Sequence, residues 1–143
     1  MNIAIHKFKE NGIIPGRGYD SDVGADLFSP VAFSVEPGET YSLNLEIGIT
    51  LPEGMSGFVW PKSSLAKRGI INMVPPIDPG YEGPIHALIF NGSGETISFE
   101  RGDKIGQLVI LPFISPDFIL DTDKEKLKKR GAGWNGSSGT KKE

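Results

Sequence analysis

The sequence contains no cysteine, only two histidines, and no apolar run long enough to cross a membrane. Without cysteine there is no disulfide, no thiolate zinc site and no cysteine nucleophile. The two histidines, His6 and His86, lack the spacing of metal ligands, which argues against a zinc site. Because cysteine is absent and no signal peptide is recognisable at the start, we expect a cytoplasmic protein without a membrane partner.

Several signatures of nucleotide-binding and hydrolytic enzymes are also missing. There is no P-loop motif, no GxGxxG that follows a strand and opens a helix, and no GxSxG nucleophile elbow. The formal net charge of −3 argues against broad nucleic-acid binding, so we expect no nucleic-acid partner. A local basic pocket for a small anion stays compatible with that charge.

The 143 residues are rich in turn formers, with 19 glycines and 11 prolines, which indicates one domain of short strands. The segment YSLNLEIGITL, residues 41–51, alternates apolar and polar residues and predicts a single strand with one buried face. NGSGE, residues 91–95, lies between two apolar runs and predicts a hairpin connection. Further strands are predicted at residues 2–5, 32–35, 57–60, 85–90, 96–99 and 106–113.

Helical structure is predicted only around SSLAKRG, where Ser63 or Ser64 is a candidate N-cap and Gly69 a candidate end. The charged run from residue 121 to 130 has one apolar residue, and we interpret it as a solvated strand exit or a frayed turn. We therefore predict an all-β barrel or sandwich over residues 1–121. Residues 122–143 are predicted to form a charged linker and a mobile Gly/Ser-rich arm.

Two stretches combine positive charge, hydroxyls and glycine in a way that suits phosphate. PKSSLAKRG joins Lys62 to two serines and the start of a possible helix, although a capped surface turn would look the same. RGAGWNGSSG joins a guanidinium to flexible glycines and two hydroxyls, and could close over a triphosphate. The alternative for this second stretch is a disordered tail, against which Trp134 argues.

Three other stretches carry carboxylates or amides. In IDPGYEG, Asp78 could orient a water molecule and Tyr81 could pack on a sugar ring, although Asp-Pro-Gly turns are common. DVGADLF contains Asp26, and RGDKIGQL places Gln107 within an apolar strand, where its amide must find a partner or face outwards. Each stretch is a weak signal by itself.

Taken in order, the five stretches resemble the five motifs of the trimeric all-β dUTPase family, over nearly the whole chain. The resemblance implies a jelly-roll-like fold, a homotrimer with active sites between subunits, and Mg²⁺-dependent hydrolysis of dUTP to dUMP and pyrophosphate. It implies that Asp78 directs the attacking water, that Tyr81 packs on the deoxyribose, and that Asn72 reads the uracil edge. Asp26 would touch the water shell of a Mg²⁺ ion otherwise held by the triphosphate. Matches to the family's phosphate-binding or arm positions are Lys62, Ser63, Ser64, Gln107, Arg130, Trp134, Asn135, Ser137 and Ser138.

This sequence departs from the family pattern at three places. Lys62 stands where the family has arginine, and Pro75 and Pro76 remove two N–H donors from the base-reading segment. Asn135 takes the place of the arm's phenylalanine, which usually stacks on uracil, while Trp134 replaces a glycine. The altered arm keeps open the alternative of a non-catalytic nucleotide-binding or regulatory relative.

A second alternative is the related dCTP deaminase, which has a similar third motif. That family continues with a glutamate that shuttles protons, where this sequence has Leu88. Leucine cannot transfer protons, so the sequence disfavours deamination.

Overall fold

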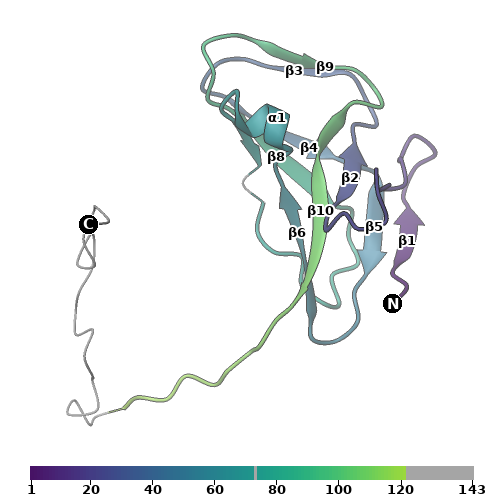
Figure 1. Ribbon diagram of the computed structural model, residues 1–143, viewed down its shortest axis with the longest axis vertical. Coiled ribbons are helices and arrows are strands. Elements are labelled where there is room, and N and C mark those ends of the chain that lie inside the picture. Colours follow the sequence, from purple (N-terminus) through teal and green to yellow (C-terminus); the bar gives the residue numbers. More distant parts are fainter. Residues whose placement is uncertain (73, 122–143) are drawn as a thin grey trace.

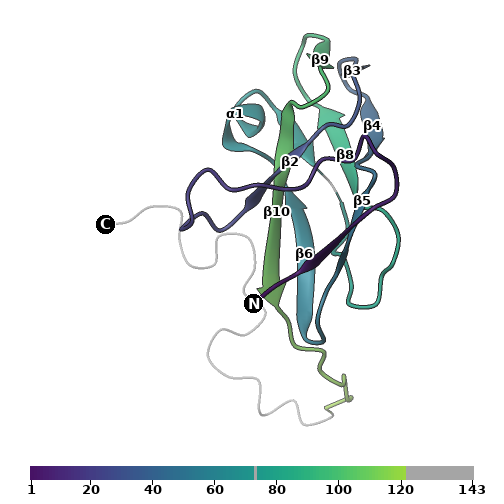
Figure 2. The ribbon, with the colours of Figure 1, turned by 90° about the vertical axis from the view of Figure 1, so that its right-hand side faces the viewer.

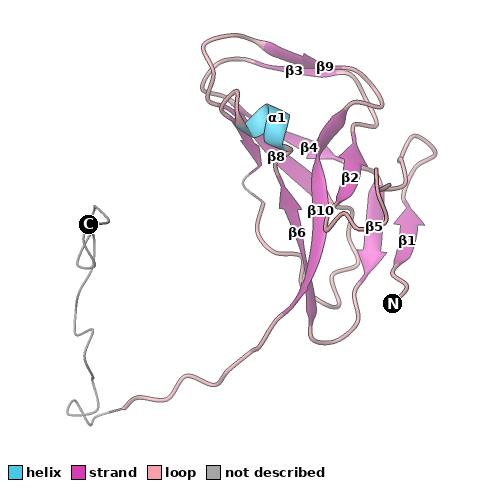
Figure 3. Ribbon diagram, viewed as in Figure 1, coloured by secondary structure: helices cyan, strands magenta, loops and turns pink. Residues whose placement is uncertain are grey.

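The computed structural model describes residues 1–72 and 74–121. Within them the chain forms ten strands and one short helix, which confirms the all-β prediction (Figure 1; Figure 3). These residues contain no helix that combines the length and the apolar character needed to span a membrane. The predicted arm, from residue 122 onward, lies outside the described residues. The elements are β1 Ala4–Lys7, β2 Ala25–Phe28, β3 Phe33–Val35, β4 Thr40–Asn44, β5 Ile47–Thr50, β6 Met55–Trp60, α1 Ser63–Ala66, β7 Ile70–Asn72, β8 His86–Asn91, β9 Ile97–Phe99 and β10 Lys104–Pro112.

The strands form small antiparallel sheets that wrap around one core in a jelly-roll-like arrangement. In the described part of the chain, the sheets are β1–β5, β2–β10–β6, β3–β9 and β4–β8–β7. β10 lies between β2 and β6, and Figure 2 shows β6 and β10 side by side along the body. This sheet therefore brings together three strands that are far apart in the sequence.

The core follows from the period of two in the strands. Along β8 the side chains alternate between half-buried and fully buried positions, as expected for a strand with one face on a core. Ala87 and Ile89 are at most 1% exposed, and Ile85 just before the strand is equally buried. Because this cluster draws on all four sheets, it fixes how they lie relative to one another.

The prediction of one strand across residues 41–51 is wrong, although its buried face is largely correct. The chain leaves β4 after Asn44, turns at Glu46, which has a φ of 55°, and enters β5 in a different sheet. The Asn44 side chain stabilises this turn, because its Oδ1 accepts the Glu46 N–H at 2.8 Å. Tyr41 lies at the border of the core, 36% exposed. The other apolar residues of the pattern are buried: Leu43, Leu45, Ile47, Ile49 and Leu51.

Residues 91–95 do not form the predicted hairpin, because β8 and β9 belong to different sheets. The buried side chain of Asn91 explains the path of the chain. Its Nδ2 donates to the carbonyls of Val35 and Glu95, each at 2.8 Å, and its Oδ1 accepts the Ser93 N–H at 2.9 Å. These hydrogen bonds turn the chain away from β8 towards β3, with which β9 pairs.

The short helix lies where it was expected, but neither serine caps it. Ser63 is the first helical residue and Lys62 holds the N-cap position without a side-chain hydrogen bond. Gly69, with a φ of 79°, follows the helix as predicted. β2 and β7 had not been predicted as strands.

Candidate active site

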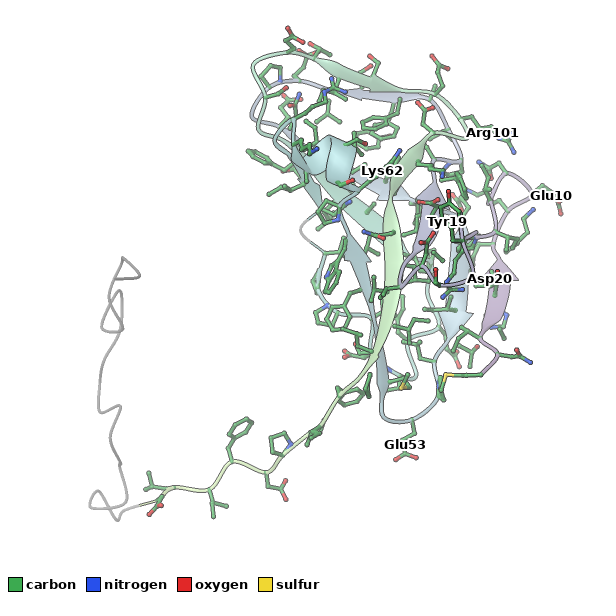
Figure 4. All side chains as sticks on the ribbon, viewed as in Figure 1. Glu10, Tyr19, Asp20, Glu53, Lys62 and Arg101 are labelled. Atoms are coloured by element: carbon green, nitrogen blue, oxygen red, sulfur yellow. The ribbon has the colours of Figure 1, made fainter. Side chains whose placement is uncertain are left out.

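The first group of candidate residues lies across the β2–β10–β6 sheet. In its register Gln107 lies opposite both Asp26 on β2 and Trp60 on β6, so the three side chains share one face. The Gln107 Nε2 donates to the carbonyl of Pro61 at 3.4 Å. Lys62 follows Pro61 directly in the sequence. The contact with Pro61 therefore places Gln107 close to the segment that carries the other predicted phosphate-binding residues, Lys62, Ser63 and Ser64. Figure 4 shows Lys62 beside α1, in the half of the body away from Glu53.

Asp26 belongs to this region but is not a free carboxylate. Its Oδ2 lies 2.6 Å from the Lys104 Nζ at the start of β10, and its side chain is 23% exposed. Its Oδ1 has no hydrogen-bond partner among the described residues. One oxygen is therefore held by the lysine, and the other can accept a hydrogen bond from a metal-bound water.

Asp78 is positioned by a tight turn anchored to β6. Ile77 exchanges two backbone hydrogen bonds with Gly57, at 3.0 and 2.7 Å. The Tyr81 N–H then donates to the Asp78 carbonyl at 3.2 Å, and Gly80 between them has a φ of 85°. Proline at the second position and a left-handed glycine at the third are typical of a type II turn. The sequence Asp-Pro-Gly-Tyr thus presents an exposed carboxylate on a rigid support.

Asp78 and Tyr81 line a mainly apolar cavity of about 240 Å³. Tyr81 is 45% exposed, and its hydroxyl donates to the Pro84 carbonyl at 2.9 Å, which fixes the ring direction. The segments before and after the turn form the walls. An apolar cavity with few polar groups is typical of a small-molecule site. The remaining lining residues are Val74, Pro75, Pro76, Ile77, Pro84, Ile85 and His86.

Within one chain, the Asp78 cavity and the Gln107 region are separate. Ile77 pairs with Gly57, whereas Gln107 pairs with Trp60, three residues further along β6. At ~3.3 Å per residue this separates them by roughly 10 Å along the strand. Lys62 lines a different cavity from Asp78. The described part of one chain thus presents two halves of a site.

Asn72, the predicted uracil reader, does not line the Asp78 cavity. Its Nδ2 donates to the Ile105 carbonyl on β10 at 3.2 Å. Its Oδ1 is buried and has no partner among the described residues. Buried polar atoms without a partner are uncommon in folded proteins.

Sequence reasoning missed most of the cavity wall. His86 was considered in the sequence as a metal ligand and set aside, yet it lines the cavity that contains Asp78. The available signal was the tight turn itself, because residues on the two sides of such a turn face one another. The predicted arm residues Arg130, Trp134, Asn135, Ser137 and Ser138 lie outside the described residues.

Comparison with known proteins identifies the family. The family model for dUTPase matches residues 10–139 of the chain. The chain belongs to the dUTPase family. The deoxyuridine 5'-triphosphate nucleotidohydrolase of Gloeobacter violaceus is 34% identical, and the match covers 97% of each chain.

Solved dUTPases share the fold. The dUTPase of Staphylococcus bacteriophage 80alpha, solved with dUPNHPP, superposes with a TM-score of 0.89 at 23% identity, over 97% of this chain and 99% of that one. A mutant dUTPase from phage phi11 of S. aureus, described with a structural Mg(II) ion, gives a TM-score of 0.80 at 24% identity, over 87% and 99%. At these identities the likeness supports the dUTPase fold and no further detail.

Proposed function

We propose that this chain hydrolyses dUTP to dUMP and pyrophosphate, with a water molecule attacking the α-phosphorus in line with the departing pyrophosphate. The observation that carries the proposal is the Asp78 carboxylate at an apolar cavity beside Tyr81, in a chain of the dUTPase family. The cavity suits a nucleoside, and the separate region around Lys62 and Gln107 suits phosphates.

The chemistry needs no covalent partner from the protein. Asp78 accepts a hydrogen bond from the water and takes its proton as the new bond to phosphorus forms. The bond between the α-phosphorus and its bridging oxygen breaks, and the electron pair leaves with pyrophosphate. Lys62, Ser63, Ser64 and Gln107 hold the phosphate oxygens, because phosphoryl transfer depends mainly on positioning and charge stabilisation.

We assign selection for the deoxynucleoside to the apolar cavity that contains Asp78 and Tyr81. The ring of Tyr81 packs against the deoxyribose, and a 2'-hydroxyl would crowd that contact. By the family resemblance Asn72 would read the base, and its buried Oδ1 has no partner among the described residues. The role of Asn72 in reading the base stays a prediction.

The residues present fit a Mg²⁺ ion held mainly by the substrate. No cluster of three or more potential ligands is found in residues 1–72 and 74–121. Mg²⁺ retains several waters and is commonly bound through one or two carboxylates and substrate phosphates. The Asp26 Oδ2 contacts Lys104, and its Oδ1 would accept a hydrogen bond from a water bound to the ion. The ion would neutralise charge on the triphosphate oxygens.

The division of the site within one chain supports assembly from several copies, and the family resemblance implies three. Residues 113–121 leave β10 and run away from the body (Figure 1). This segment exposes Ile114, Phe118, Ile119 and Leu120, each between 87% and 94%. So much exposed apolar surface favours a contact with another chain.

Light scattering after gel filtration should give three times the monomer mass of 15.5 kDa.

A panel of deoxynucleoside triphosphates with Mg²⁺ tests the proposed reaction. Products are assayed for both pyrophosphate and ammonia. We expect pyrophosphate from dUTP, little from the other nucleotides, and no ammonia. Binding of dUTP without turnover would indicate a regulatory relative, and ammonia from dCTP would indicate a deaminase. Either result would overturn the proposal.

Gly24→Ala should weaken hydrolysis without unfolding the protein. A Cβ at position 24 would overlap the end of the Gln107 side chain, which is flexible and would be displaced. Loss of hydrogen bonds to a charged phosphate should lower kcat/KM for dUTP roughly 10-fold or more. Steady-state kinetics measures this loss, and the thermal midpoint should stay close to that of the wild type.

Gly16→Ala provides the matched control, because a Cβ there meets nothing within 4 Å although Gly16 bridges to Asp26. We expect wild-type kinetics from this control. Unchanged kcat/KM in a folded Gly24→Ala protein would argue against a phosphate-binding role for Gln107.

A further inference from the structure

A second, polar cavity of about 370 Å³ lies beside the phosphate-binding region. Three cationic side chains line it from different elements. Lys62 follows β6, Arg68 follows α1, and Lys104 opens β10. Ser98 of β9 adds a hydroxyl, and Asp103 adds the one carboxylate of the lining.

The charged side chains that line this cavity leave it with a net positive charge within the described chain. Lys104 is paired with Asp26 at 2.6 Å. The side chains of Lys62 and Arg68 have no hydrogen bond or ion pair with any described residue. The Asp103 Oδ2 accepts the backbone N–H of Glu100 at 2.8 Å, and this carboxylate offsets only one of the two unpaired cations. Two unpaired cations that face one polar cavity favour a bound anion.

The position of the cavity indicates which anion it takes. It contains Lys62, and the Lys104–Asp26 pair joins it to Gln107, which lies opposite Asp26 in the sheet. The cavity therefore shares Lys62 with the phosphate-binding region and has no lining residue in common with the apolar cavity at Asp78. A ligand whose α-phosphate is held by Gln107, with Asp78 supplied by another copy of the chain, would extend its terminal phosphates towards Arg68.

We propose that Arg68 is a further substrate-binding residue, which grips the β- and γ-phosphates of dUTP and the pyrophosphate product. This inference rests on the proposed function. Lys62 is a point charge at the place where the family has arginine, so it cannot bind two phosphate oxygens through a planar fork. Arg68 lines the same cavity and supplies that fork from the other end of α1.

Steady-state kinetics of Arg68→Ala tests the assignment by comparing ligands with and without terminal phosphates. We expect the KM for dUTP and the inhibition constant of inorganic pyrophosphate to rise roughly 10- to 100-fold, as for a lost charge-assisted pair. The inhibition constant of dUMP should change less than about twofold, because dUMP lacks the phosphates that Arg68 contacts. Lys67→Ala is the matched control, since Lys67 is exposed and does not line the cavity.

A rescue variant separates a direct contact from a structural effect. Lys62→Arg in the Arg68→Ala background should restore much of the pyrophosphate affinity, because it returns a fork to the same cavity. Equal weakening of dUMP and pyrophosphate, or no weakening of either, would overturn the proposal. If the wild type does not hydrolyse dUTP, calorimetric titration of wild type and Arg68→Ala with pyrophosphate still tests the cavity. Equal affinity of the two proteins would count against it.

Discussion

Asp78→Asn should lower the turnover of dUTP by about 100- to 10,000-fold while nucleotide affinity stays within a small factor. Asparagine keeps the size and shape of the side chain but cannot accept the proton of the attacking water. The turn should persist, because it depends on the backbone hydrogen bonds between Ile77 and Gly57 and on the Pro-Gly sequence. The loss should therefore appear in kcat and not in folding.

Single-turnover kinetics together with equilibrium binding of dUTP separates these quantities. Glu82→Gln is a suitable control, because it removes an exposed carboxylate four residues away without touching the Asp78 cavity. We expect the control to behave like the wild type. Near-normal turnover in Asp78→Asn would remove Asp78 from its role and leave the water without a base in the described site.

The fold was predictable where a local pattern and a tertiary contact agree. β8 and β10 lie close to their predicted positions, because long apolar runs must be buried somewhere. The turn at Glu46 was not predictable, since the alternation of buried residues continues while the chain changes sheets. The connection after Asn91 looks like a hairpin locally, but hydrogen bonds to Val35 and Glu95 direct it elsewhere.

The candidate site, like the fold, was predictable from the sequence only in part. The order of the five motifs was enough to indicate the family, and Asp78 and Tyr81 do share a cavity. The pairing of Gln107 with Asp26 depends on a register between β10 and β2, which no local pattern encodes. The contribution of Arg68 to the polar cavity likewise depends on tertiary contacts, so it was visible only in the structure.

Deletion of residues 130–143 should abolish most hydrolysis while the fold survives. The hydrophobic core is built from residues 27–108, so the deletion removes none of its members. By resemblance, Arg130 of this segment grips the γ-phosphate, which leaves as part of pyrophosphate, so its guanidinium would stabilise the negative charge that develops on the leaving group. We therefore expect kcat/KM for dUTP to fall by at least about two orders of magnitude, with a thermal midpoint close to that of the full chain.

Two shorter changes make this experiment specific. Deletion of residues 140–143 alone removes charge but leaves the fifth motif intact, so activity should be retained. Arg130→Ala should reproduce much of the loss seen with the longer deletion, because the guanidinium is the charged group of that motif. A large fall in thermal midpoint for the longer deletion would instead assign the segment to the fold, and full activity would exclude it from the site. Since Lys62 and Arg68 of the described residues already line one cavity, some pyrophosphate binding should persist without the arm.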